Sequence, residues 1–200
     1  MRILIIGGTG NIGKAVFDDL KDEFQVIRAT RNSNEIKVDI KSEISIIEMF
    51  EKVGNVDAVV STLGGVVFAP LDKLNSKSFN DSFNDKLMGQ INLVLIGRKY
   101  INFGGSFTLT SGILSTSFIP NCICATTVNN ALNGFVRASA IELIKENIRI
   151  NVVSPTILEE SYLNYYPKFS GFYPVSSKKV AFAYRRSITG VESGLVIDVE

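Results

Sequence analysis

The chain has 200 residues, of which 46% are hydrophobic and 20% charged, and this is enough to bury a full core within one domain. Its 21 basic and 20 acidic residues leave a net charge of +1 without a block of like charge, which argues against nucleic-acid and anionic-membrane partners. The longest apolar stretch, near residues 91–96, is far shorter than the roughly 18 residues that span a bilayer. We therefore expect one cytoplasmic domain over residues 1–200.

Two scarce residue types narrow the possible chemistry. Histidine is absent, which excludes Ser-His and Cys-His nucleophilic catalysis and every His-ligated metal site. Cys122 and Cys124 are the only cysteines, and a C-x-C pair without another soft ligand nearby cannot complete a zinc site. We expect no metal, and we interpret the two cysteines as thiols in a loop.

A glycine-rich turn near the start of the chain is the strongest functional signal. Residues 3–6 are Ile-Leu-Ile-Ile, typical of a strand covered on both faces, and the string GGTGNIG follows. Gly7, Gly10 and Gly13 allow a tight turn, close approach of the backbone to a pyrophosphate and close packing of the next helix. Alone, this spacing also fits an ordinary turn, but the strand before it and the amphipathic stretch after it favour a dinucleotide site.

The predicted second strand, residues 24–30, ends at a residue that bears on the choice of cofactor. Proteins that bind NAD usually place an acidic residue about 20 residues beyond the glycines, whereas an arginine there accommodates the 2′-phosphate of NADP. Arg31 occupies this position, which favours NADP over NAD. The alternative is a solvated arginine at the end of a strand.

Strands and helices alternate through the rest of the chain. We predict strands over residues 36–40, 57–61, 106–111, 148–153 and 195–199, and helices over residues 44–53, 76–100, 126–146 and 176–187. This alternation predicts an α/β fold, a Rossmann-type doubly wound parallel sheet of about seven strands in three layers. The small-residue turn 61–65 follows a predicted strand at the edge where such sheets bind ligands, although it also fits a plain loop.

Two segments indicate contacts beyond the sheet. The helix through residues 87–96 is apolar almost all round, which fits either a partner subunit or a position deep within the core. Residues 162–174 contain Tyr162, Tyr165, Tyr166 and Tyr173, and they suit either a lid over a ligand or a packed surface loop.

Taken together, the motifs resemble the short-chain dehydrogenase/reductase family over essentially the whole chain. The matching strings are GGTGNIG at 7–13, STLG at 61–64 where the family usually has NNAG, GSFTLTSG at 105–112, NGFVRASAIEL at 133–143 and IRINVVSP at 148–155. The glycine spacing is nearer the extended and atypical branches of that family. The resemblance implies an NADP-dependent oxidoreductase that transfers a hydride to or from a small carbonyl or alcohol substrate.

The resemblance also implies which residues hold NADP. The glycine turn would bind the pyrophosphate, Arg31 the 2′-phosphate, and residues 39–40 the adenine. Residues 63–64 would lie beside the nicotinamide-side ribose and Pro155 beside the nicotinamide, although Thr156 stands where a glycine is usual. The implied cofactor-binding residues are Gly7, Thr9, Gly10, Asn11, Ile12, Gly13, Arg31, Asp39, Ile40, Ser61, Leu63, Gly64 and Pro155.

The catalytic positions of the family differ in this chain. The Tyr and Lys of its Tyr-x-x-x-Lys pattern align with Ala125 and Asn129, its Ser with Gly112, and the Asn of its central helix with Lys86. One interpretation is a replacement site in which Lys86 supplies the cation, Ser111 or Thr110 a hydrogen bond and one of the four lid tyrosines the hydroxyl. The other is a non-catalytic module that senses NADP(H) or regulates a partner, and the fold is compatible with both.

The family also suggests an assembly. Its members commonly pair the helix through residues 87–96 and the helix 126–146 with their symmetry mates. The resemblance therefore implies a homodimer or homotetramer.

Overall fold

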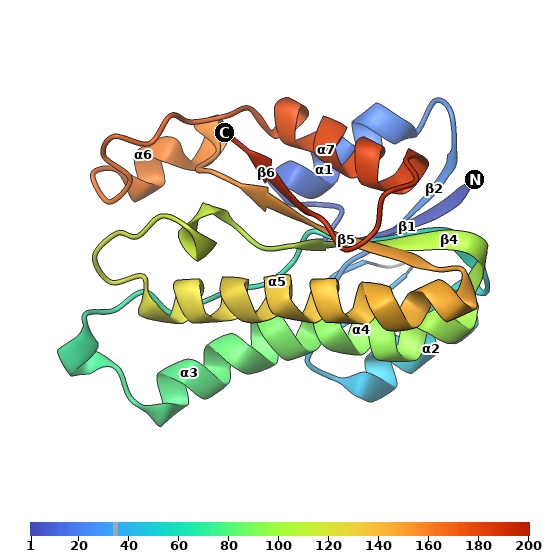
Figure 1. Cartoon of the computed structure of the whole chain (residues 1–200), viewed down its shortest axis with the longest axis horizontal. Coiled ribbons are helices and arrows are strands. Elements are labelled where there is room, and N and C mark those ends of the chain that lie inside the picture. Colours follow the sequence, from blue (N-terminus) through green and yellow to red (C-terminus); the bar gives the residue numbers. More distant parts are fainter. Residues whose placement is uncertain (34–35) are drawn as a thin grey trace.

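The computed structural model describes residues 1–33 and 36–200, and within them six parallel strands form a central sheet (Figure 1). The strand order is β2-β1-β3-β4-β5-β6, so the chain turns back across the sheet after β2. The strands are β1 (Arg2–Ile6), β2 (Gln25–Ala29), β3 (Val56–Ser61), β4 (Ile101–Thr110), β5 (Arg149–Pro155) and β6 (Val196–Val199). The predicted doubly wound parallel sheet is confirmed.

Helices cover both faces of the sheet and give three layers (Figure 1). On one face lie α1 (Asn11–Leu20) and α7 (Ser177–Thr189), and on the other lie α2 (Glu43–Val53), α4 (Gly89–Gly97) and α5 (Ile123–Leu143). Two shorter helices, α3 (Ser76–Ser82) and α6 (Tyr162–Tyr165), lie toward the end of the molecule where the strands finish. A π-helical segment, Phe83–Met88, joins α3 directly to α4.

The side chains of β1 show why this strand lies at the centre. Ile3 and Ile5 belong to the apolar cluster under α1 and α7, whereas Leu4 and Ile6 belong to the cluster under α2, α4 and α5. All four side chains are fully buried, as the two-residue period of a strand requires when both faces are covered. Burying each such side chain contributes about 1.5–3 kcal/mol, so this run is a major stabilising element.

The prediction of a strand at residues 36–40 is wrong, and for this reason the sheet has six strands among the described residues instead of about seven. The segment makes a single parallel bridge, Thr30 to Lys37, and residues 34–35 lie outside the described part of the chain. The backbone then leaves the sheet because the N–H of Asp39 donates to Ser45 Oγ at 3.0 Å, at the start of α2. Among the described residues, β2 is therefore the edge strand.

The other elements differ from prediction mainly at their ends. The helix predicted over residues 76–100 runs as α3, the π-helical segment and α4, and its last turn is a 3₁₀ turn at Arg98–Tyr100. Cys122 and Cys124 are both buried. Cys124 lies within α5, so its interpretation as a loop thiol is wrong, whereas Cys122 precedes the helix as its N-cap. The helix begins at Ile123, three residues before its predicted start, which carries Cys124 into the core.

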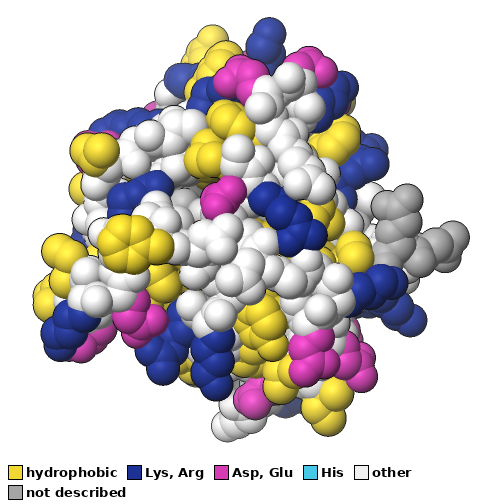
Figure 2. Space-filling view, turned by 90° about the vertical axis from the view of Figure 1, so that its right-hand side faces the viewer, with side chains coloured by type: hydrophobic (Ala, Val, Ile, Leu, Met, Phe, Trp, Pro, Cys, Tyr) yellow, Lys and Arg dark blue, Asp and Glu magenta, His cyan; other side chains and the backbone are white. Residues whose placement is uncertain are grey.

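At the end of the molecule where the strands begin, one carboxylate joins three of them. Asp57 accepts hydrogen bonds from Asn102 Nδ2 at 2.7 Å and from the backbone N–H of Arg2 at 2.6 Å. These bonds hold the pKa of the Asp57 carboxyl below its ordinary value. Figure 2 shows this end, where acidic, basic and apolar side chains are interspersed. Within the described residues, no helix is both long and apolar enough to cross a bilayer.

Candidate active site

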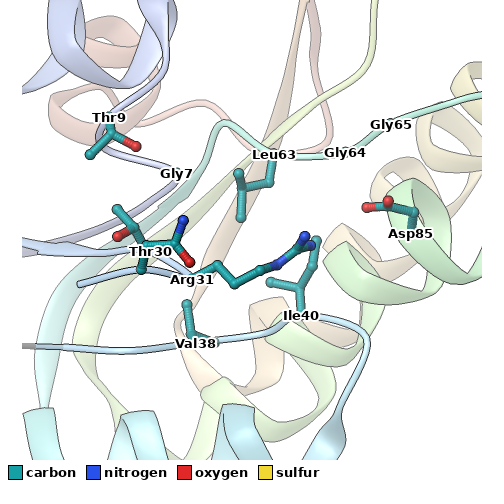
Figure 3. A pocket seen from close by; sticks show the side chains of 11 residues that line it. Gly7, Thr9, Thr30, Arg31, Val38, Ile40, Leu63, Gly64, Gly65 and Asp85 are labelled. Atoms are coloured by element: carbon teal, nitrogen blue, oxygen red, sulfur yellow. The ribbon is translucent and has the colours of Figure 1, made fainter. Parts of the chain in front are cut away.

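A groove of about 440 Å³ opens where β1, β2 and β3 end (Figure 3). The three strands finish at one level, since Ile6 pairs with both Ala29 and Ser61. The loops that follow them therefore meet at the same edge, the usual ligand site of open α/β sheets. The groove is lined by Gly7, Thr9, Thr30, Arg31, Asn32, Val38, Ile40, Leu63, Gly64, Gly65 and Asp85.

The glycine turn has the geometry that a bound pyrophosphate needs. Gly7 has φ of 90°, and its N–H donates to the carbonyl of Ala29 at 3.0 Å. A Cβ on Gly13 would lie 2.8 Å from the Cα of Gly8, so only glycine lets α1 approach this closely. Gly10 caps α1 without a side-chain hydrogen bond, which leaves the first N–H groups of the helix for an anion.

Arg31 extends across the groove between Leu63 on one side and Val38 and Ile40 on the other (Figure 3). Its guanidinium lies 3.8 Å from Asp39 Oδ1, and both side chains are about half exposed, 61% and 45%. An exposed pair of this kind contributes only about 0–1 kcal/mol, so Arg31 can exchange it for a phosphate at little cost. Asp39 itself points at Arg31 and at the backbone N–H of Lys41, and it does not line the groove.

The predicted cofactor residues fall into two groups. Gly7, Thr9, Arg31, Ile40, Leu63 and Gly64 line the groove. The others do not line it. Gly10 and Gly13 belong to the turn itself, Ile12 packs on the core beneath α1, and Asn11 donates to Ser161 Oγ at 3.4 Å. Ser61 is buried, and Pro155 lines a second pocket. Sequence reasoning missed Asp85, which only the path of the π-helical segment brings to the groove.

This second pocket, the inner pocket, has a volume of about 230 Å³ and lies at the ends of β4 and β5. Most of its wall is apolar, and three of its polar residues, Lys86, Ser111 and Asn129, are joined by hydrogen bonds at what we call its polar end. The lining residues are Val66, Phe68, Lys86, Ser111, Gly112, Ile113, Leu114, Ala125, Asn129, Pro155, Thr156, Ile157, Leu158, Ser161, Tyr165 and Phe169. The predicted catalytic residues Lys86 and Ser111 are therefore brought together, from elements 25 residues apart in sequence.

Lys86 is buried at the polar end of the inner pocket. Its Nζ donates to the carbonyl oxygen of Ser111 at 2.9 Å and to Asn129 Oδ1 at 2.7 Å. Both acceptors are neutral, and desolvation lowers the pKa of Lys86 to about 8. Within the described residues these bonds use two of its three N–H donors, so the third is left for a ligand.

The partners of Lys86 are themselves held in place. Asn129 Nδ2 donates to the carbonyl of Gly112 at 3.3 Å, and Ser111 Oγ donates to the carbonyl of Asn129 at 3.3 Å. Gln90, one turn beyond Lys86, accepts from the N–H of Thr110 at 2.8 Å and donates to its carbonyl at 2.9 Å. These bonds fix the helix that carries Lys86 against the end of β4.

Gly64 joins the groove to the inner pocket. It lines the groove at φ of 129°, and a Cβ at this position would lie 2.7 Å from Lys86 Cβ. The stem of the lysine therefore packs directly against the groove wall. Whatever binds in the groove beyond Leu63 lies next to the residue that provides the buried ammonium.

The lid tyrosines are not equivalent. Tyr165, on α6, lines the inner pocket, whereas the described lining does not include Tyr162, Tyr166 or Tyr173. Tyr162 packs against Tyr166 with 5.9 Å between ring centroids, and Tyr173 is 80% exposed. Among the described residues, no group of three or more acidic or cysteine side chains could hold a metal ion.

Comparisons with known proteins agree with this geometry. Residues 13–192 match the family described as enoyl-(acyl carrier protein) reductase. The crystal structure of lin1944 from Listeria innocua is 43% identical with a TM-score of 0.97, and each chain covers 100% of the other. A small-chain dehydrogenase solved in complex with NADPH is 26% identical with a TM-score of 0.88, covering 100% of this chain and 96% of its own.

A curated relative gives a partial match. The hydroxynaphthalene reductase-like protein Arp2 of Metarhizium guizhouense is 27% identical over 125 residues, which cover 60% of this chain and 47% of the relative. The chain thus spans about half the length of the curated relatives it matches. The family match, by contrast, extends from α1 to the loop before β6 and includes the inner pocket and all of the groove lining except Gly7 and Thr9. With its sheet order, its glycine turn and this match, the chain belongs to the short-chain dehydrogenase/reductase family.

Proposed function

We propose that the protein is an NADP-dependent oxidoreductase that reduces a small carbonyl compound or oxidises the corresponding alcohol. The observation that carries the proposal is the contact between Gly64 and Lys86. It sets the end of the groove of about 440 Å³ against a buried ammonium at the polar end of a small apolar pocket. Such a pair of compartments suits a cofactor and a carbonyl that react with each other.

The groove fits the cofactor on features of the chain itself. A Cβ on Gly7 would meet the Leu63 and Thr62 side chains, and one on Gly13 would meet the backbone of Gly7 and Gly8, so this tight turn requires glycine. Such a turn at the start of α1 would bind a pyrophosphate. Arg31 lies where it would pair with a 2′-phosphate, and Ile40 and Leu63 offer apolar contacts to a base and a ribose. When bound, NADPH supplies the hydride. The small-chain dehydrogenase that resembles this chain was solved with NADPH, which supports the choice of dinucleotide.

The inner pocket contains a lysine ammonium, but Lys86 supplies it from a different position than in the family pattern. The family carries its lysine at the position of Asn129 and its asparagine at the position of Lys86, and here these two side chains share a hydrogen bond of 2.7 Å. The two departures are therefore one reciprocal exchange, in which the cation comes from the opposite helix. Ala125, which lines the pocket, carries no phenol, so in this proposal another group takes the place of the family's proton donor.

The pocket walls define the remaining roles. Apolar side chains such as Phe68, Ile113 and Phe169 exclude water and would hold the carbon skeleton of the substrate. Lys86 would bind the carbonyl oxygen, and Ser111 positions Lys86 through its backbone carbonyl. Because the volume is only about 230 Å³, the substrate should be small and largely apolar.

A turnover screen with NADPH and a panel of small aldehydes and ketones tests the proposal. We expect NADPH oxidation with at least one apolar carbonyl, and loss of that activity in Lys86→Met with NADPH affinity retained. If NADPH binds and no member of a broad panel is reduced, the proposal fails. That result would favour a second candidate, a module that senses or responds to NADP(H), for which the absence of a phenol at Ala125 is the supporting observation.

A further inference from the structure

We propose that Lys86 itself donates the proton to the carbonyl oxygen, in place of the missing phenol. The inference rests on the proposed function and deepens it. Lys86 would act as the general acid in reduction and as the general base in alcohol oxidation. It would not serve only as a charge beside another donor.

The geometry leaves one N–H of Lys86 for this task. Ser111 O and Asn129 Oδ1 take two donors at 2.9 and 2.7 Å, and both acceptors lie at the wall of the inner pocket. A buried ammonium with two fixed bonds has a defined direction for its third. The stem is fixed as well, because Gly64 packs against it and Gln90 ties its helix to β4.

The hydroxyl groups nearby are poorly placed to act as the donor. Ser111 Oγ donates to the carbonyl of Asn129. The hydroxyl of Thr110 lies 2.5 Å from both Ser61 O and the Tyr184 hydroxyl, and Thr110 is not among the residues lining the pocket. Tyr165 reaches the pocket from α6, and the described part of the chain shows no hydrogen bond between it and Lys86.

The charges around Lys86 favour a proton that can leave near neutral pH. Of the described residues that line the inner pocket, Lys86 and Tyr165 are the titratable ones, and α5, β4 and β5 present uncharged side chains. Asp85, its neighbour in the chain, lines the groove instead and pairs with Lys41 at 3.0 Å. Without a carboxylate partner, burial lowers the pKa of Lys86 to about 8, close to the range in which a general acid is most effective.

The proton balance is complete. As the carbonyl carbon gains the hydride, the π electron pair of the C=O bond moves onto oxygen, an Nζ–H bond of Lys86 breaks and an O–H bond forms. The carbonyl is reduced by two electrons, the reduced dinucleotide is oxidised, and Lys86 is left as a neutral amine that takes a proton from solvent. Alcohol oxidation runs through the same steps in reverse and needs the neutral amine.

This role fixes the signs of the pH dependence. Reduction needs protonated Lys86, so its kcat/KM should be constant below and fall above the pKa of about 8. Oxidation needs the neutral form and should rise with pH through the same value. The matching direct measurement is the titration of Lys86 in the protein without ligand, by NMR of ¹³C-labelled lysine, with Lys86→Arg used to assign the resonance. A midpoint near the ordinary lysine value of about 10.4 would overturn the inference.

Chemical rescue separates proton donation from a structural role. Lys86→Ala should lose roughly 10²–10⁴-fold in reduction, and small primary amines should restore part of it with rates that depend on amine pKa. Lys77→Ala is the matched control, since Lys77 is exposed and pairs only with Asp81 in the described chain. Amines should not change its activity.

The outcomes distinguish the inference from the function on which it rests. If no carbonyl is reduced, the proposed function fails and the inference fails with it. If reduction proceeds but Lys86→Ala is insensitive to every amine, or Tyr165→Phe abolishes the alkaline limb of the pH profile, only the inference fails. Reduction with amine rescue, and an alkaline limb unchanged in Tyr165→Phe, would support it.

Discussion

Arg31 reaches the groove from the end of β2, and Arg28 on the same strand offers a natural comparison. Arg28 lies over the Phe17 ring, 4.1 Å from its centroid, and it is not among the groove-lining residues. The two arginines are three residues apart and carry the same charge. If replacing each arginine by aspartate has different effects on cofactor preference, the difference must come from the position of the side chain, because the change in net charge is the same.

We predict that Arg31→Asp removes most of the preference for NADPH over NADH. A charge-assisted hydrogen bond contributes about 1.5–3 kcal/mol, so wild-type protein should prefer NADPH by roughly tenfold or more. Calorimetric titration with both dinucleotides measures this. Arg28→Asp should keep the preference, and equal affinities in the wild type would show that Arg31 does not contact the 2′-phosphate.

Gly64 is the residue at which the groove and the inner pocket can be disturbed together. In Gly64→Ala, the backbone would be held at a φ that L residues rarely adopt, which costs about 1–3 kcal/mol, and the new methyl group would push the Lys86 stem. We expect lower stability and a strong loss of reduction. Gly134→Ala is the control, because a Cβ there meets nothing within 4 Å inside α5, and it should leave activity unchanged. A fully active Gly64→Ala would contradict the proposed contact.

The exchange between Lys86 and Asn129 changes what a restoration experiment requires. Ala125→Tyr with Asn129→Lys would recreate the Tyr-x-x-x-Lys spacing, with the two residues on one helix face. It would also place a second ammonium against Lys86, where the Asn129 amide now lies 2.7 Å away. We predict that this double variant loses most of the activity of the native chain and that adding Lys86→Asn recovers it. Steady-state reduction of one generic carbonyl by all three proteins measures this, and a highly active double variant would contradict it.

At the scale of elements, Gln90 is the clamp between α4 and β4. It is fully buried and satisfies both the N–H and the carbonyl of Thr110. Gln90→Leu would leave these two backbone groups without partners, and we expect a loss of roughly 2–4 kcal/mol in the free energy of unfolding. Urea denaturation measures it, with the exposed edge-strand variant Gln25→Leu as the control that should change little. If Gln90→Leu lowers the free energy of unfolding by less than Gln25→Leu does, the hydrogen bonds of Gln90 do not hold α4 against β4.

The elements that sequence reasoning predicts well are those that bury one continuous apolar pattern. Residues 3–6 are apolar on both faces, and they form the central strand. Residues 36–40, Ile-Lys-Val-Asp-Ile, alternate apolar and charged side chains, which also predicts a strand. Yet the N–H groups of Val38 and Asp39 donate to the Thr30 carbonyl and the Ser45 side chain, a choice that depends on where α2 begins. Local apolarity cannot distinguish a strand from a buried loop with the same side chains.

The candidate site shows the same contrast between local sequence signals and contacts between residues far apart in the chain. The glycine turn and Arg31 are local signals, and they lie at the groove as predicted. The contact between Lys86 and Asn129 spans 43 residues, and it exists because the π-helical segment and α5 pack side by side. Alignment against a family pattern identifies the two residues as separate departures. We propose that the 2.7 Å hydrogen bond between their side chains makes the two departures a single exchange.

At the scale of the whole molecule, α4 and α5 leave apolar side chains exposed. Leu95 on α4 is 53% exposed, and Ile141 on α5 and Ile144 just beyond it are 69% and 72% exposed. α4 is also buried through Leu93 and Val94, so its apolar excess serves the core as well as the surface. Exposed apolar side chains of this kind favour an interface between copies of the chain.

We therefore propose a homodimer or homotetramer that uses α4 and α5. Sedimentation velocity at micromolar concentration should show the oligomer, and Ile141→Glu should dissociate it because it would bury a charge in an apolar contact. Val191→Glu is the control, since Val191 is 91% exposed in the loop before β6. A wild-type monomer at that concentration would exclude the assembly.

The bond between Lys86 and Asn129 also constrains how this sequence can change over generations. A single replacement that swaps either residue for the other would bring two ammonium groups, or two amides, into contact inside a buried pocket. The two ammonium groups would repel each other, and the two amides would leave the pocket without a cation. Both single-substitution sequences should therefore be disfavoured. Descendants of this arrangement should keep lysine at one position with asparagine at the other. Paired covariation of these two sites would then identify its relatives among sequences that lack the Tyr-x-x-x-Lys pattern.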